Sequence, residues 1–144
     1  MFQRILIPTD GSELTAKAVD TAVRLAKSIG ARLYTISVKE PFPYSAISEM
    51  QPTPPQEFFD AQERIAAKRI QGVRAACEAG GVPCEAHTIE ALHPWEAIIE
   101  HAKRMECDLL VMASHGRRSV TALLLGSETQ KVLTHSKIPV LVVR

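Results

Sequence analysis

Five short apolar segments, separated by segments with helical periodicity, limit the folds available to this chain of 144 residues. The apolar segments are nearly continuous rather than alternating, which is typical of strands buried on both faces of a parallel sheet. They occupy residues 4–8, 31–40, 82–90, 107–114 and 138–143. Helical patterns occupy residues 13–30, 56–81, 93–106 and 126–137. Strands that alternate with helices predict one α/β domain, residues 1–144, with a mainly parallel sheet covered on both faces.

Local signals place the ends of several helices. Ser12 is a plausible N-cap for the first helix, which Gly30 ends, and the glycine pair 80–81 ends the second. Pro94 is suited to the first turn of the third helix. Residues 41–55 hold five of the nine prolines, so we predict a loop there that can serve as a lid.

Composition excludes several classes of protein. The net charge of +1 gives no field that would attract nucleic acid or an anionic membrane. No segment has the length of a membrane helix, and the first residues lack the pattern of a signal peptide. Cys77, Cys84 and Cys107 are an odd number without CxxC spacing, which is typical of buried free thiols in a reducing compartment. We therefore expect a cytoplasmic protein with no nucleic-acid or membrane partner.

The unusual residues follow the strands. Thr9 and Asp10 come after the first strand, Val38 closes the second, His93 follows the third, and the stretch 113–129 follows the fourth. In a parallel sheet the carboxyl ends of the strands share one edge, and ligands bind there at the point where strand order reverses. The sequence therefore predicts a binding site at this edge.

The stretch "ASHGRRSVTALLLGSET", residues 113–129, has the parts of a phosphate cradle. Gly116 and Gly126 permit turns or a close approach to a ligand. Ser127 is expected as the N-cap of the last helix, with Gln130 completing a capping box. The free N–H groups of a helix N-terminus attract phosphate, and Arg117 with Arg118 would add charge. The P-loop and Rossmann patterns are absent. From these features alone, a phosphate site and a plain glycine turn before a capped helix are equally supported.

The sequence resembles the universal stress protein family. The resemblance rests on "RILIPTDGSE" at the start, on "SHG", nine residues and then "GS", and on the final "IPVLVVR". It spans essentially the whole chain. The nucleotide-binding branch of the family carries Gly, two residues, Gly, nine residues, then Gly with Ser or Thr. Gly116, Gly126 and Ser127 match this spacing, and Ala113 replaces the first glycine.

The resemblance implies a sheet of order 3-2-1-4-5, like that of the adenine nucleotide alpha-hydrolases, and a site for an adenine nucleotide. Asp10 would lie near the ribose or phosphates, Val38 would contact the adenine, and main-chain N–H groups would hold the phosphates. The implied site residues are Pro8, Thr9, Asp10, Val38, Met112, Ala113, His115, Gly116, Arg117, Gly126, Ser127, Glu128 and Thr129.

Three departures bear on this prediction. Ala113 is tolerated if its φ is negative, as we expect at the end of a strand. Ser119 stands where many relatives have glycine, which stiffens the loop. The Glu128 carboxylate suits the start of a helix but would repel a phosphate if it turned inward.

Other patterns suggest chemistry that we rank lower. "MASHG" imitates a nucleophile elbow with Ser114 and His115, but Met112 replaces its first glycine and side chains of adjacent residues rarely face each other. Cys84 and His87 are three residues apart on a strand, hence on opposite faces, and are not expected to share a metal. We predict no metal site within the protein, and we expect Trp95 to pack its helix. His93 either touches a ligand at this edge or lies in a loop without a role.

The apolar strand 138–143 would be an exposed edge, and self-pairing across a two-fold axis would cover it. The resemblance implies the same homodimer. We therefore predict a stress-response or regulatory protein that binds ATP, ADP or AMP as a homodimer, with Mg²⁺ accompanying ATP near Asp10. Bound nucleotide would order loops 40–56 and 114–125. We predict no dedicated enzyme. The alternatives are a nucleotide-free interaction module, favoured by Ala113 and Glu128, and a hydrolase using Ser114, His115 and Asp10.

Overall fold

The computed structural model describes residues 1–42, 55–116 and 125–144. The strands are β1 (Arg4–Pro8), β2 (Arg32–Lys39), β3 (Cys84–Glu90), β4 (Leu109–Ala113) and β5 (Val140–Val143). The helices are α1 (Glu13–Ile29), α2 (Gln56–Gly80), α3 (Pro94–Arg104) and α4 (Ser127–His135). All neighbouring strands pair in parallel, in the order β3-β2-β1-β4-β5. The predicted fold class and strand order are confirmed.

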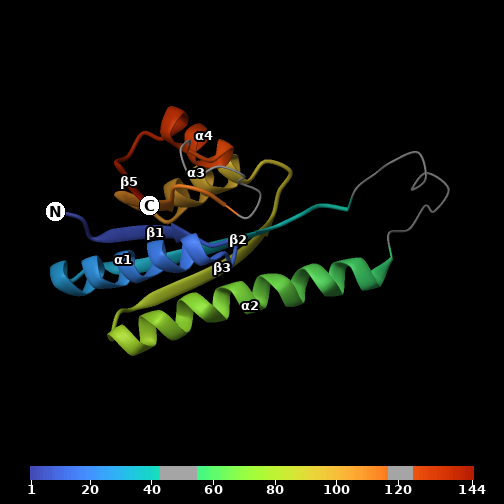
Figure 1. The fold of residues 1–144 in the computed structure, drawn as a ribbon, viewed down its shortest axis with the longest axis horizontal. Helices are drawn as coiled ribbons and strands as arrows, with labels where there is room; N and C mark the ends of the chain where they lie inside the picture. Colours follow the sequence, from blue (N-terminus) through green and yellow to red (C-terminus); the bar gives the residue numbers. More distant parts are fainter. Residues whose placement is uncertain (43–54, 117–124) are drawn as a thin grey trace.

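Helices cover both faces of the sheet, with α1 and α2 on one face and α3 and α4 on the other (Figure 1). Alternate residues of each strand enter opposite cores because successive side chains of a strand point to opposite faces. Ile7 and Leu33 belong to the core under α1 and α2, whereas Leu6 and Tyr34 belong to the core under α3 and α4. This burial on both faces explains the continuous apolar runs.

Most predicted helix ends are confirmed. Ser12 caps α1, with its hydroxyl accepting from the N–H of Thr15 at 3.2 Å. Gly30 and Gly81 end α1 and α2 in left-handed conformations, with φ of 72° and 68°. Pro94 is the first residue of α3. Most of the proline-rich loop, residues 43–54, lies outside the described residues.

The last strand is an edge strand, as predicted, but it begins at Val140 rather than at residue 138. Pro139 has no N–H to donate, and the first ladder bond uses its carbonyl, which accepts from Leu110 N–H at 3.0 Å. Before it, the Ser136 hydroxyl and Ile138 exchange two hydrogen bonds that form a turn. Pairing therefore starts only after the proline.

Two glycines of α2 provide a matched test of packing on the α1 side. A Cβ at Gly80 would lie 2.5 Å from Cγ1 of Val23, whereas a Cβ at Gly72 would meet nothing within 4 Å. We expect Gly80→Ala to lower the free energy of unfolding by about 1–3 kcal/mol through overpacking. Gly72→Ala should raise it by up to about 1 kcal/mol through helix propensity. Urea denaturation of both variants checks this, and equal stability of the two would contradict the packing described for Gly80.

Candidate functional site

The switch in strand order lies between β1 and β4, which are neighbours at the centre of the sheet. The chain leaves β1 toward β2 on one side, and β4 continues the sheet on the other. Asp10 follows β1 and Gly116 follows β4. These two residues meet, because a Cβ built on Gly116 would lie 2.9 Å from Oδ2 of Asp10. The predicted meeting of the two segments at one edge is therefore found.

The segment after β1 is a tight turn that fixes Asp10. Its Oδ1 accepts from the N–H of Ser12 at 2.9 Å and from the hydroxyl of Thr15 at 2.7 Å. Gly11 has a left-handed φ of 76°, which permits the turn. Thr9 is buried, and its N–H donates to the Ile36 carbonyl of β2 at 2.9 Å. The carboxylate thus starts the turn and also presents its second oxygen toward Gly116.

Two hydrogen bonds tie the end of β4 to the start of α4, and a third ties it to β5. The Thr129 hydroxyl donates to the Ala113 carbonyl at 2.8 Å. The N–H of Gly126 donates to the Ser114 carbonyl at 2.8 Å, and the N–H of Ser114 donates to the Val143 carbonyl at 2.8 Å. The first turn of α4 is therefore held against the sheet edge. The N–H groups of the first helical residues have no acceptor within the helix, so they are the donors that a ligand at this edge would use.

At Gly116 and Gly126, the glycines that match the family spacing, a side chain is excluded by lack of room and not by a positive φ. Among the described residues, the glycines with positive φ are Gly11, Gly30 and Gly81. At Gly126 a Cβ would lie 3.2 Å from Cα of His115 and 3.3 Å from the Ser114 carbonyl oxygen. Both contacts are to backbone, which cannot swing away as a long side chain can. The spacing of Gly116 and Gly126 thus marks the place where two backbone segments approach closely.

The predicted capping of the last helix is wrong. Gly126, with φ −62° and ψ 151°, is the N-cap of α4, and Ser127 is its first helical residue. No side chain caps this end, and the Gln130 amide donates to the Leu125 carbonyl at 2.8 Å instead. Gly126 takes the cap position because its N–H is held by Ser114 and its carbonyl accepts from Gln130 N–H at 3.0 Å. The helix therefore starts at Ser127, one residue earlier than it would with Ser127 as the N-cap.

Glu128 is bound to the start of α3. Its Oε2 accepts from the N–H of Trp95 at 2.9 Å, at the first turn of α3. A carboxylate at a helix N-terminus is favourable because of the helix dipole. Trp95 itself stacks on His135 of α4, with ring centroids 4.4 Å apart, so it packs the two helices together as expected. The side chain whose charge would oppose an anion is thus committed to α3.

The expectation that Ser114 and His115 do not face each other is wrong. The Ser114 hydroxyl and Nδ1 of His115 are 2.9 Å apart and hydrogen-bonded. Both residues follow the last residue of β4, so the alternation of a strand no longer separates their side chains. Both are buried, and Nε2 of His115 has no hydrogen-bond partner among the residues that the structure describes.

The other residues singled out from the sequence lie in the core, in β4, on the surface or outside the described residues. Val38 and Met112 pack in the core under α3 and α4. Ala113 lies in β4 without a positive φ, as expected. Arg117, with Arg118 and Ser119, lies outside the described residues. His93 is exposed and precedes α3.

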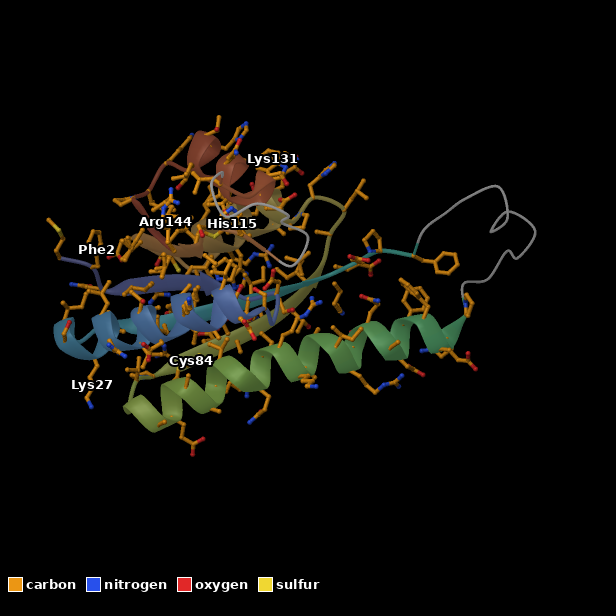
Figure 2. The ribbon with its side chains drawn as sticks, viewed as in Figure 1. Phe2, Lys27, Cys84, His115, Lys131 and Arg144 are labelled. Carbon is orange, nitrogen blue, oxygen red and sulfur yellow. The ribbon has the colours of Figure 1, made fainter. Side chains whose placement is uncertain are left out.

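Cys84 and His87 lie on opposite faces of β3, as predicted. Cys84 packs against the core under α1 and α2, and the His87 ring contacts His101 of α3. Figure 2 shows Cys84 beside α2 and His115 on the α4 side. Within the ranges 1–42, 55–116 and 125–144, no group of three metal-ligating side chains comes together.

The sequence reasoning missed Arg69. This residue of α2 lies against the turn after β1, because a Cβ at Gly11 would be 3.1 Å from its Cγ and 3.7 Å from its Nε. It therefore brings a positive charge close to Asp10. The buried residues Ala66, Ile70 and Val73 show from the sequence pattern which side of α2 faces the sheet. That pattern does not show how far α2 extends along the sheet, and so it could not place Arg69 beside the turn.

His101 gives the protein a pH dependence that is separate from the candidate site. It is 1% exposed, and neither ring nitrogen has a hydrogen-bond partner among the described residues. Burial, with the nearby His87 and Arg104, lowers the pKa of His101 below its ordinary value of 6.5, and Glu85 opposes this. The unfolded chain therefore binds this proton at a higher pH than the folded chain does.

We expect the contribution of His101 to the free energy of unfolding to be constant well above pH 6.5. It should fall as the pH drops below that value, by at most about 1.4 kcal/mol per pH unit for one proton. His101→Leu should remove this part of the slope, and His93→Gln, at an exposed position, should keep it. Urea titrations between about pH 5 and 8 measure the slope. A slope unchanged in His101→Leu would contradict the assignment.

The strand order, and the edge where β1 and β4 end, define a class of α/β proteins. Several solved structures have the same fold. The universal stress protein UspA from Lactobacillus plantarum is 26% identical, with a TM-score of 0.79, covering 99% of this chain and 98% of that chain. A universal stress protein solved in complex with cAMP is 25% identical, with a TM-score of 0.68, covering 99% and 97%.

Sequence comparison gives the family. A universal stress protein of Thermus aquaticus is 36% identical over 145 residues, covering all of this chain and all of that protein. Residues 1–144 match the model of the Universal stress protein family. The chain therefore belongs to the universal stress protein family.

Proposed function

We propose that this chain is a stress-response or regulatory protein that binds an adenine nucleotide, ATP or its relatives ADP and AMP, at the edge where β1 and β4 end. The observation that carries the proposal is the approach of the Gly126 backbone to within contact of His115 and Ser114, at the first turn of α4. This approach brings the first turn of α4 beside the turn at Gly116, and a Cβ at Gly126 would press on that backbone. Helix N-termini of this kind bind phosphate.

Charges of both signs surround the edge, with Asp10 facing Gly116 and Arg69 nearby. Glu128 is bound to the start of α3, and Arg69 lies beside the turn that holds Asp10. The buried Nε2 of His115 adds one polar atom that a ligand oxygen would satisfy. In this proposal the 13 residues named from the family resemblance form the site, with Val38 toward the adenine. A relative at 25% identity that was solved with cAMP supports an adenine ligand.

Magnesium would accompany ATP in this proposal. Oδ1 of Asp10 is used by Ser12 and Thr15, and Oδ2 faces Gly116. This second oxygen is a hard ligand of the kind that Mg²⁺ accepts, alongside phosphate oxygens and water. The protein's own contribution would be a single carboxylate, so the ion would bind together with ATP and not before it.

We also propose a homodimer formed through β5, in the cytoplasm, without nucleic-acid or membrane partners. The edge strand has partly exposed Val140 and Val142, and Leu141 is 39% exposed. Pairing with a second copy would cover both the apolar side chains and the outward backbone groups. In the part of the chain that the structure describes, no helix is long and apolar enough to span a bilayer.

A second candidate function, hydrolysis by Ser114, is favoured by its hydrogen bond to His115. A dedicated hydrolase also needs a third group that orients the histidine. Within the described residues, Nε2 of His115 has none, so we propose binding rather than turnover as the main activity. Steady turnover of ATP that is lost in both Ser114→Ala and His115→Gln would favour the hydrolase instead.

Calorimetry of the purified protein with ATP, AMP and GTP, together with identification of any retained nucleotide, tests the proposal. We expect micromolar or tighter binding of ATP or AMP and weaker binding of GTP. Absence of retained nucleotide and of measurable heat with all three would overturn it and favour a nucleotide-free interaction module.

A further inference from the structure

Two of the three cysteines lie together at the end of the sheet opposite to the candidate site. Cys77 is in the last turn of α2 and is 1% exposed, whereas Cys84 is the first residue of β3 and is partly exposed. Both belong to the same apolar cluster under α1 and α2, with Cys84 packed against it. Figure 2 shows Cys84 beside the end of α2, away from His115.

A short, closed turn holds the two thiols close. Residues 78–83 connect them, and the N–H of Val82 donates to the Cys77 carbonyl at 2.9 Å. Gly81 reverses the chain with φ 68°, and its N–H donates to the Glu78 carbonyl at 3.1 Å. Glu78, Gly80 and Gly81 also line an open hollow on the surface, so the turn has room to adjust on that side.

The two thiols have different acidity. A hydrogen bond from the Cys77 thiol lowers the pKa of Cys84, and the charges of Arg74 and Arg32 add to this, while burial opposes it. The reciprocal interaction with Cys84, and then burial, raise the pKa of Cys77. Cys107 lies in the other core, and burial raises its pKa to about 12. Since the thiolate is the reactive form and Cys84 is the more exposed thiol of the pair, we expect Cys84 to react first.

We propose that Cys77 and Cys84 form an oxidation site that takes a small hydroperoxide such as hydrogen peroxide and closes to an intramolecular disulfide. Cys84 is the partly exposed partner, and Cys77 is buried in the same core cluster across a short turn. This site is independent of the nucleotide site.

The reaction balances in two steps. The Cys84 thiolate attacks one oxygen of hydrogen peroxide, the O–O bond breaks, and hydroxide leaves and takes up a proton as water, giving Cys84 sulfenic acid. The Cys77 sulfur then attacks the Cys84 sulfur, an S–S bond forms, and the sulfenic oxygen leaves as a second water with the Cys77 proton. Two thiols are oxidised by two electrons and one peroxide is reduced to two waters.

Peptide mapping of the full-length wild-type protein tests the proposal directly. Reduced protein is treated with one equivalent of hydrogen peroxide, free thiols are alkylated after denaturation, and the digest is analysed by mass spectrometry without reductant. We expect a Cys77–Cys84 disulfide within single chains and an alkylated Cys107. Free Cys77 and Cys84 after peroxide treatment, a disulfide between two chains, or faster loss of Cys107 would each overturn the proposal.

Single substitutions separate the two roles. Cys84→Ser should slow consumption of peroxide at least about tenfold, because it removes the more acidic thiol. Cys77→Ser should stop the reaction at Cys84 sulfenic acid, which dimedone traps. Cys107→Ser is the matched control and should form the disulfide at the wild-type rate. Dimedone labelling of Cys107 instead of Cys84 in Cys77→Ser would contradict the assignment. The wild-type map decides the question by itself if a variant does not fold.

Discussion

Gly126→Val is expected to lower the affinity for ATP by about a hundredfold or more, which corresponds to about 2.8 kcal/mol. The first carbon of the new side chain would already lie 3.2 Å from Cα of His115 and 3.3 Å from the Ser114 carbonyl oxygen. The two methyl groups of valine extend beyond this carbon. Either α4 shifts away from the end of β4, or the methyl groups occupy the place of the phosphate. Gly126 is partly buried and belongs to neither core cluster, so the fold should persist. Calorimetry with ATP measures the loss.

Gly72→Val is the matched control for this substitution. Gly72 is exposed on α2, and a Cβ there meets nothing within 4 Å. This control should bind ATP as the wild type does, although valine is a modest helix former. Circular dichroism and urea denaturation show whether each variant is folded. Wild-type affinity in a folded Gly126→Val would mean that the phosphates lie elsewhere.

Leu141→Lys is expected to convert the proposed homodimer into a monomer at micromolar concentration. When an edge strand pairs with its own copy across a two-fold axis, the same short segment meets itself. The new lysines would therefore lie near each other, and each would lose apolar contact with the partner copy. Sedimentation velocity of the purified protein measures the change.

Leu133→Lys provides a control of matched exposure. Leu133, on α4, is 40% exposed, and Leu141, on β5, is 39% exposed, so both substitutions change a similar surface. We expect Leu133→Lys to remain a dimer. A Leu141→Lys variant that sediments as the wild type does, or a wild type that is already monomeric, would contradict dimerisation through β5.

The parallel sheet and the helix ends were accessible to sequence reasoning because each depends on short-range rules, whereas the strand order came from the family resemblance. Continuous apolar runs require burial on both faces, and a glycine that ends a helix needs only the left-handed conformation, as at Gly30 and Gly81. The meeting of Asp10 with Gly116 followed from topology, since β1 and β4 end at one edge. The spacing of Gly116, Gly126 and Ser127 came from the family resemblance.

The details that sequence reasoning missed depend on contacts between distant elements. The cap of α4 moved to Gly126 because Ser114 of another element holds its N–H. Glu128 serves α3, and Arg69 of α2 reaches the turn at Gly11, and neither contact leaves a periodic pattern in the sequence. The Ser114–His115 hydrogen bond depends on the bend that follows β4. Such contacts depend on the position of each helix along the direction of the strands.

Backbone amide chemical shifts of ¹⁵N-labelled protein, followed during titration with ATP, test the central claim most directly. If main-chain N–H groups at the edge of β4 and α4 hold the phosphates, the largest shifts should occur at Gly116, Gly126 and Ser127. Gly30 and Gly81, at the opposite end of the sheet, should stay unchanged and serve as internal controls. Saturation by ATP without shifts at Gly126 and Ser127, or with the largest shifts at Gly30 and Gly81, would contradict the account.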